Sequence, residues 1–246
     1  MLMNITVVGY WHAYPERGEA TSGYLLEHGS TKLLLDCGSG VVSNVQKYID
    51  LIDLNGVVLS HYHHDHFADI GPLQYAQIVN KGMGKRKKNF TIYAHQEDTA
   101  SFNKLAYKDL VKSVAYNERE PLKIGPFAFN FFKTQHPVPC YAMKITCDGK
   151  QIVYTADSSY FAGLADFANG CDLVITECSG YSGDHVGQYG HMNSKDAAKL
   201  AVHSGVEKII LSHLPHHGNH EQLKREVEET FSGDVVLAKA GLVLEL

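Results

Sequence analysis

A histidine-rich stretch with the pattern H-x-H-x-D-H follows a short apolar run, residues 56–60, that is typical of a β-strand. Side chains two residues apart in extended backbone project to the same side, so His61 and His63 can bind one metal ion. Asp65 and His66 lie just beyond them and can turn toward a second ion. Four such residues in this order at the end of a strand predict a metal site.

Three later residues have the same character, because each ends a strand-like run: His136, Asp157 and His213. A zinc-type ion takes about four donors and leaves one position for water or substrate, so the histidine stretch alone supplies too few. Each of the three could also be an ordinary polar residue at a strand end. Together they complete two sets of donors, with three histidines on one ion, two histidines and an aspartate on the other, and Asp157 between them.

The run SHYHHDH, followed by His136, TADSS and LSH, resembles the metallo-β-lactamase superfamily over essentially the whole chain. The resemblance implies an α/β fold of the αββα sandwich type, in which two mixed sheets pack face to face with helices outside, as a single domain of residues 1–246. It implies a site for two metal ions, with one set of ligands formed by His61, His63 and His136, a second set by Asp65, His66 and His213, and Asp157 bridging.

Two departures from better-known branches narrow the function that the resemblance implies. An aspartate stands at the bridging position, where the main class of zinc β-lactamases carries cysteine, which argues against antibiotic hydrolysis. A histidine stands at the second motif position, where flavodiiron proteins carry glutamate, which argues against a redox di-iron site.

Further segments resemble the RNase Z branch of this superfamily. The stretch TSGYLLEHGSTKLLLDCGSG matches its N-terminal signature, and ITECSGY with YGHMNSKDAAKLA matches its paired His/Glu motifs. The resemblance implies that His191 is the general acid and that Glu177 orients it, although Thr176 stands where the branch usually carries histidine. His191 could instead be a polar residue at a helix entry, and Glu177 could support a metal ligand. Asp36 is expected to be structural, holding the loop that carries the metal motif.

This set of residues suits hydrolysis of a phosphodiester. Two divalent ions lower the pKa of a water between them and neutralise the phosphate oxygens. Asp65 can accept the proton of that water, and His191 can protonate the leaving oxygen. Glu177 would fix the tautomer of His191 and raise its pKa. Zinc is the leading metal because the donor sets contain no thiolate, and manganese or iron is the alternative.

The expected substrate is a small phosphodiester, such as a cyclic nucleotide, and not tRNA. The RNase Z branch binds tRNA through a long arm between the positions that match His136 and Asp157, but residues 137–156 hold only two expected strands and an Asp148-Gly149 turn. The formal net charge is −5, which weakens attraction to a nucleic-acid backbone. The basic run at residues 81–88 is expected to be a solvated connection, with phosphate contact as the alternative.

Three alternative functions remain open at this point. The first is tRNA 3′ processing by an RNase Z-like endoribonuclease. The second is hydrolysis of an ester, thioester or lactone, as in glyoxalase II and lactonases, which share the ligands but lack the Glu177/His191 pair. The third is a metal-loaded RNA-binding protein without turnover. An aromatic loop at residues 10–14 could close over the metals or form a dimer contact.

The elements that must position these residues alternate between strands and helices. Strands are expected at residues 5–9, 23–27, 32–36, 56–60, 90–94, 172–176, 208–212, 234–239 and 242–246, with a β-rich middle at 122–154, and helices at 42–49, 72–80, 194–203 and 221–231. Asn193 and Asp196 form an expected N-cap pair.

Composition excludes several classes of protein. Apolar residues make up 44 % of the 246 and charged residues 20 %, which suits a globular chain and neither a disordered nor a membrane-embedded one. Five cysteines without C-x-x-C spacing indicate free thiols in a reducing cytoplasm. No signal peptide or membrane span is expected, and a homodimer is a further expectation from the resemblance.

Overall fold

Polar and glycine-containing turns divide the apolar runs into short strands that assemble into two sheets. The computed structural model describes residues 2–85 and 89–246. The chain divides into unit 1, formed by Met1–Asn117 with Lys239–Glu245, and unit 2, formed by Glu118–Ala238 with Leu246. Among the described residues, each unit contains one seven-stranded sheet.

The sheet of unit 1 has the order β14-β1-β2-β3-β4-β5-β6. Neighbours from β14 to β3 are antiparallel, and those from β3 to β6 are parallel, so the sheet is mixed. Its strands are β1 Asn4–Gly9, β2 Gly23–His28, β3 Thr31–Leu35, β4 Gly56–Val58, β5 Phe90–Ala94, β6 Val111–Ala115 and β14 Val243–Glu245.

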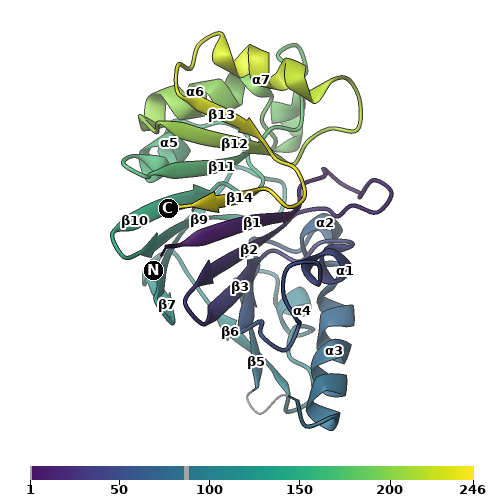
Figure 1. The fold of residues 1–246 in the computed structure, drawn as a ribbon. Coiled ribbons are helices and arrows are strands. Elements are labelled where there is room, and N and C mark those ends of the chain that lie inside the picture. Colours follow the sequence, from purple (N-terminus) through teal and green to yellow (C-terminus); the bar gives the residue numbers. More distant parts are fainter. Residues whose placement is uncertain (1, 86–88) are drawn as a thin grey trace. The chain divides into compact units, whose positions relative to one another are not determined.

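Helices of unit 1 cover the apolar side chains of this sheet. They are α1 Val41–Val45, α2 His64–Phe67, α3 Ile70–Gly82 and α4 Thr99–Phe102, and α1 to α3 gather on one side of β1 to β3 (Figure 1). Val41 and Val45 of α1 and Leu73 of α3 pack in one buried cluster with Leu34 and Val57 of the sheet. Burial of each such side chain contributes about 1.5–3 kcal/mol, and the cluster holds the helices on the strands.

The sheet of unit 2 has the order β13-β12-β11-β10-β9-β8-β7. Here the antiparallel pairs run from β7 to β10 and the parallel pairs from β10 to β13, which makes this sheet mixed as well. Its strands are β7 Leu122–Ile124, β8 Phe127–Lys133, β9 Tyr141–Cys147, β10 Lys150–Tyr154, β11 Leu173–Glu177, β12 Lys208–Ser212 and β13 Asp234–Leu237.

Helices of unit 2 are α5 Ala162–Ala168, the 3₁₀ helix η1 Val186–Tyr189, α6 Ser194–Ser204 and α7 His220–Glu228. Helices α6 and α7 lie alongside β12 and β13, at the yellow-green end of Figure 1. The expected N-cap is confirmed, because the Asn193 side chain accepts a hydrogen bond from the Asp196 amide and the Asp196 side chain accepts one from the Asn193 amide in a capping box.

Parallel neighbours bring the candidate residues together within each unit. Strands β3 and β4 are parallel neighbours, so the residues that follow them, Asp36 and Ser60, meet at one edge of the unit 1 sheet. Strands β10, β11 and β12 are parallel neighbours too, and Asp157, Glu177 and His213 lie at their carboxyl ends. Carboxyl ends of adjacent parallel strands are where open α/β sheets build their sites.

The expected fold class, two mixed sheets with helices, is confirmed, but several elements differ from the sequence expectation. The first helix ends at Val45, because Lys47 and Tyr48 bond back only three residues and the chain tightens into turns. Strand β6, with mostly exposed residues, and the short helix α5 have no apolar periodicity that would have predicted them. Among the described residues, no helix is long and apolar enough to cross a membrane.

The expected hairpin between His136 and Asp157 is confirmed. Asp148 and Gly149 both have positive φ, 47° and 81°, between β9 and β10, as in a two-residue turn of type I′. All residues from 137 to 156 are described, and the two strands and their turn account for most of them, so no arm is inserted here. The basic run at 81–88 begins at the end of α3, and its residues 86–88 lie outside the described residues.

Candidate metal centre

The histidine stretch of unit 1 forms a tight turn at the end of β4. His63 is extended, and the short helix α2 begins directly after it and carries Asp65 and His66. The ring centroids of His61 and His63 are 4.9 Å apart and those of His61 and His66 are 4.1 Å apart. The Asp65 Oδ2 atom lies 3.7 Å from His66 Nε2. Unit 1 therefore brings all four predicted ligands of its stretch together.

A buried carboxylate holds two of these rings. Asp36, the first residue after β3, accepts a hydrogen bond from His66 Nδ1 at 2.7 Å. It also accepts bonds from the Ser60 amide at 2.7 Å and the Ser60 hydroxyl at 2.8 Å. The same hydroxyl lies 2.9 Å from His61 Nδ1. Asp36 thus orients His66 directly and His61 through Ser60.

The D-x-G-x-G loop, residues 36–40, and the segment before β2 also hold the backbone of the histidine stretch. The Cys37 amide donates to the His66 carbonyl at 2.7 Å, and the Ser22 amide donates to the Asp65 carbonyl at 3.1 Å. A Cβ atom on Gly38 would lie 2.0 Å from the Asp65 carbonyl oxygen, so only glycine fits there. The expectation that Asp36 and its loop are structural agrees with these contacts.

The aromatic loop of unit 1 reaches the same cluster. The Ala13 amide donates to Asp65 Oδ2 at 3.0 Å, with Ala13 in the left-handed region at φ 60°. Tyr10 and Trp11 stack on each other at 5.2 Å, and Tyr14 is exposed. The loop is therefore tied to a predicted metal ligand.

Unit 2 places two of its predicted ligands, both histidines, around the third, an aspartate. His136 follows β8, Asp157 follows β10 and His213 follows β12. The two oxygens of Asp157 face different rings, Oδ1 at 3.6 Å from His213 Nε2 and Oδ2 at 4.0 Å from His136 Nε2. All three residues belong to the second unit, so this arrangement is a property of that unit alone. A carboxylate with one oxygen toward each ring has the form of a bridging ligand.

The hydrogen-bond partners of four histidines favour the tautomer that metal binding requires. In each of four rings Nδ1 faces a hydrogen-bond partner: His61 the Ser60 hydroxyl, His66 Asp36, His136 the Gly190 carbonyl at 3.1 Å, and His213 the Ser179 hydroxyl at 3.0 Å. A proton on Nδ1 leaves the Nε2 lone pair as the metal donor. Burial also lowers the pKa of His136, which keeps that ring neutral. These donors fit a divalent metal ion.

A second carboxylate, Glu177, binds His191 in unit 2. His191 Nδ1 lies 3.1 Å and 3.3 Å from the two Glu177 oxygens, and the buried carboxylate also accepts from the Ser158 amide at 2.7 Å. The His191 ring stacks on His213 at 5.4 Å and meets His136 edge-on at 5.2 Å. The Glu177–His191 pair expected from the sequence is therefore formed, directly beside two predicted metal ligands.

Backbone pairing holds the loop that carries His191. The Ser179 amide donates to the Met192 carbonyl at 2.9 Å, and the Ser194 amide donates to the Gly180 carbonyl at 2.9 Å. The loop after β11 and the loop before α6 are thus paired on both sides of His191.

Three contributors to these clusters were not predicted from the sequence: Ser60, Ser179 and Gly190. Ser60 and Ser179 act only through a neighbouring carboxylate and ring, and their small polar side chains give no signal by themselves. Gly190 presents its carbonyl to His136, and its left-handed φ of 80° marks it only once the backbone is known. The one available signal was that each serine lies within two residues of a predicted site residue.

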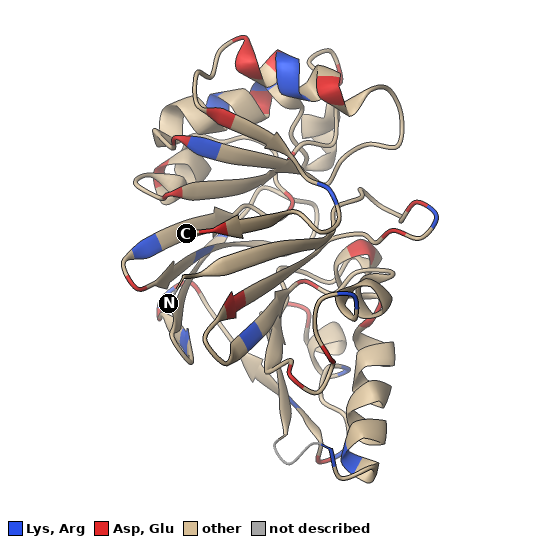
Figure 2. Cartoon of the chain, in the orientation of Figure 1, with Lys and Arg blue, Asp and Glu red and all other residues tan. Residues whose placement is uncertain are grey.

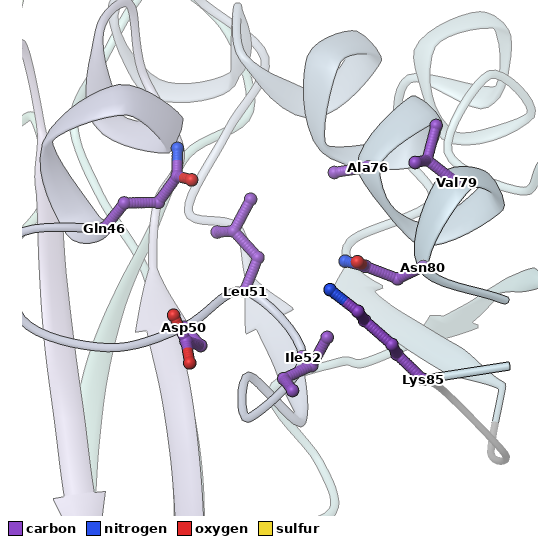
Figure 3. A pocket seen from close by; sticks show the side chains of 8 residues that line it. All are labelled: Gln46, Asp50, Leu51, Ile52, Ala76, Val79, Asn80 and Lys85. Atoms are coloured by element: carbon purple, nitrogen blue, oxygen red, sulfur yellow. The ribbon is translucent and has the colours of Figure 1, made fainter. Parts of the chain in front are cut away.

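A separate hollow lies between α3 and the loop after α1 in unit 1. Its volume is about 360 Å³, and Figure 3 shows Leu51 and Gln46 on one side facing Ala76 and Val79 on the other. None of the predicted metal ligands lines it. The hollow is a feature of the helix packing and not part of the histidine clusters.

The fold and the two His/Asp clusters define a metal-binding α/β protein, and comparison with known families assigns its class. The profile of the beta-lactamase superfamily domain matches residues 31–214. The chain belongs to this family, and the metallo-β-lactamase fold expected from the sequence is confirmed.

Similar proteins extend over the whole chain. The "Probable metallo-hydrolase YhfI" of Bacillus subtilis is 46 % identical over 243 residues, covering 99 % of this chain and 100 % of that one. The crystal structure of Bacillus subtilis YhfI, described as a metallo-beta-lactamase fold protein, matches with a TM-score of 0.99 over 100 % of both chains. Ribonuclease Z of Methanopyrus kandleri is 25 % identical over 276 residues, covering 97 % of this chain and 96 % of that one. Family and clusters together support a metal-dependent hydrolase.

Proposed function

We propose that the chain is a metal-dependent phosphodiesterase that hydrolyses a small, cyclic phosphodiester. In this proposal two divalent ions, zinc in the first place with manganese or iron as alternatives, bind the seven predicted ligands. One ion is held by three histidines, His61, His63 and His136. The other is held by two histidines and an aspartate, His66, His213 and Asp65. A further aspartate, Asp157, bridges them.

The observation that carries the proposal is the Glu177–His191 pair. Hydrolysis of a phosphodiester expels an alkoxide, which needs a proton from a general acid. The glyoxalase II and lactonase types that the resemblance offers as alternatives lack this pair. His191 Nδ1 is bound to Glu177, so its Nε2 is the atom that can deliver a proton to a leaving oxygen. Its ring stacks on His213, so the proton would be delivered next to a metal ligand.

Asp65 is the second catalytic residue of the proposal. Metal ions bound here would supply an activated water and neutralise the phosphate charge. Asp65 would accept a proton from that water while its other contacts, including the Ala13 amide, hold the carboxylate in place. His191 and Asp65 then serve as acid and base, and Glu177 keeps His191 in the donating orientation.

Three features support a small substrate. The hairpin between His136 and Asp157 leaves no arm that could hold tRNA. The net charge is −5, and Figure 2 shows Asp and Glu interspersed with Lys and Arg along both units, as on α7. A long polyanion would gain little from such a surface. The proposal includes a cytoplasmic location and leaves a homodimer as a further expectation.

One specific observation favours a second candidate function. The Methanopyrus kandleri relative is a ribonuclease Z, and it aligns with nearly the whole of this chain. tRNA 3′ processing is therefore the alternative to be tested beside the small phosphodiesters. Ester, thioester and lactone hydrolysis, and metal-loaded RNA binding without turnover, are the further alternatives.

A substrate panel on protein of defined metal content tests the proposal. We expect cleavage of bis-p-nitrophenyl phosphate and of at least one cyclic nucleotide, with little cleavage of pre-tRNA, thioesters or lactones. The His191→Ala variant should lose about 10²–10⁴ in kcat on the phosphodiester while binding metal as the wild type does. A loss of tenfold or less would remove His191 from its role as general acid.

The control and the contrary outcomes separate the alternatives. His203→Ala changes a histidine of α6 whose ring bonds Tyr160, away from the clusters, and should keep full activity. Efficient 3′ cleavage of pre-tRNA would refute the small-substrate proposal in favour of the ribonuclease. Hydrolysis of thioester or lactone alone would refute the phosphodiesterase.

A further inference from the structure

Ser179 lies between the proposed acid pair and a proposed metal ligand. Its hydroxyl donates to Glu177 Oε2 at 2.6 Å and lies 3.0 Å from His213 Nδ1. A carboxylate only accepts, so the hydroxyl proton points to Glu177 and its oxygen accepts the Nδ1 proton of His213. We propose that Ser179 is a positioning residue that orients His213 for metal binding through Glu177, an inference that rests on the proposed metal centre.

Glu177 and His213 are too far apart for the carboxylate to orient the imidazole ring directly. The Glu177 Oε2 and His213 Nδ1 atoms are 4.0 Å apart, beyond a hydrogen bond. The serine oxygen fills that gap with two bonds of normal length. Without the hydroxyl, the Nδ1 proton would face a carboxylate that it cannot reach.

Backbone strain gives His213 a reason to need such support. Its φ is 53°, in the left-handed region that residues other than glycine adopt at a cost of about 1–3 kcal/mol. Such a backbone persists only where surrounding contacts hold it, and the Nδ1 bond fixes both the rotation and the tautomer of the ring. Ser179 itself is held by its amide bond to the Met192 carbonyl and by burial, with 6 % of its surface exposed.

Unit 1 contains the same arrangement of a carboxylate, a serine and two imidazole rings, which supports the inference for unit 2. There the buried carboxylate of Asp36 binds His66 directly and reaches His61 through the Ser60 hydroxyl, at 2.8 Å and 2.9 Å. In unit 2 the buried carboxylate of Glu177 binds His191 directly and reaches His213 through Ser179. In each unit one carboxylate and one serine therefore orient two imidazole rings.

In unit 2 this arrangement connects metal binding to the proposed proton transfer. Glu177 supports the proposed acid on one side and a proposed metal ligand on the other. Loss of Ser179 should weaken metal binding more strongly than it lowers turnover at saturating metal. Loss of His191 should lower turnover more strongly than metal affinity. Glu177→Gln should lower both metal affinity and turnover.

Three substitutions at position 179 separate the effect of the hydroxyl from the effect of side-chain size. Ser179→Ala removes the hydroxyl, Ser179→Thr keeps it, and Ser179→Val has the shape of threonine without it. Zinc affinity is measured by competition with a chromophoric chelator, and the absorption spectrum of the cobalt-loaded protein reports the ligand geometry. We expect the alanine and valine variants to bind the affected ion about 10–100-fold more weakly, with an altered cobalt spectrum, and threonine to restore both.

Ser204→Ala is the matched control. It removes another buried serine hydroxyl, one that bonds the Ala201 carbonyl at 3.1 Å within α6, and should leave zinc affinity and the cobalt spectrum unchanged. Zinc affinity of Ser179→Ala within threefold of the wild type, or equal losses in the alanine, valine and threonine variants, would overturn the inference. A wild-type protein that binds zinc but cleaves no phosphodiester would overturn the proposed function and leave the Ser179 result intact.

Discussion

Gly190 lies where a backbone carbonyl must face an imidazole ring. Its φ is 80°, and a Cβ atom there would lie 2.8 Å from His136 Nδ1 and 2.6 Å from Pro137 Cδ. Gly190→Ala should therefore push the His136 ring off its carbonyl partner and lower zinc affinity by about 10–100-fold. Zinc titration of the purified variant, together with its free energy of unfolding, measures the effect.

A second glycine provides the control for this residue. Gly205, the C-cap of α6, also has a left-handed φ, 66°, but its missing Cβ would meet no atom within 4 Å. Gly205→Ala should cost about 1 kcal/mol of unfolding free energy through backbone strain alone and leave zinc affinity unchanged. Equal zinc affinities in the two variants would mean that crowding at His136 is not what requires glycine at position 190.

Helix α6 connects local stability to the position of His191. Its capping box is formed by Asn193, two residues after the histidine, and Asp196. Asn193→Ala should lower the free energy of unfolding by about 0.5–2 kcal/mol and also reduce kcat several-fold, because the loop that carries His191 loses its anchor. Denaturant unfolding and turnover measured on the same preparation test both effects.

Helix α7 offers the matched cap. Asn219 accepts a hydrogen bond from the Glu221 amide at 3.0 Å, as Asn193 does for its own helix, but it carries no catalytic neighbour within two residues. Asn219→Ala should lower stability by a similar amount without reducing kcat. If both variants lost turnover in proportion to stability, the position of His191 would not depend on the cap of α6.

Elements with a strong local signal were the ones that the sequence predicted well. Strands Phe90–Ala94 and Lys208–Ser212 coincide with their expected bounds, because apolar runs end at polar residues on both sides. Helix α2 was not expected, since its four residues are too few to show apolar periodicity and include two predicted ligands, Asp65 and His66. Two amides from elsewhere in unit 1 bond its carbonyls, Cys37 from the loop after β3 and Ser22 from the segment before β2.

At the scale of the whole molecule, the sequence pointed to the residues that cluster in each unit more readily than to the small residues that hold them. The predicted ligands in each unit cluster because carboxyl ends of parallel strands meet at one edge, a rule that needs only strand order. Ser60 bonds Asp36 across 24 positions of the chain, Ser179 meets His213 across 34, and Gly190 faces His136 across 54. Such contacts become visible only when the folded backbone is known.

The five cysteines report on the packing of the whole molecule. All are buried and unpaired with each other, and burial raises the pKa of the Cys171 thiol to about 11 and those of Cys37 and Cys178 well above their usual range. A raised pKa leaves little thiolate at pH 8, and burial blocks the reagent. Native protein should therefore react slowly with a thiol reagent such as DTNB, and all five thiols should react in guanidinium.

Zinc should slow the native reaction further, because a ligand that binds only the folded state lowers the population of open forms. Rapid labelling of any thiol in the native, zinc-loaded protein would contradict a closed core, and an identical rate with and without zinc would contradict metal binding coupled to folding.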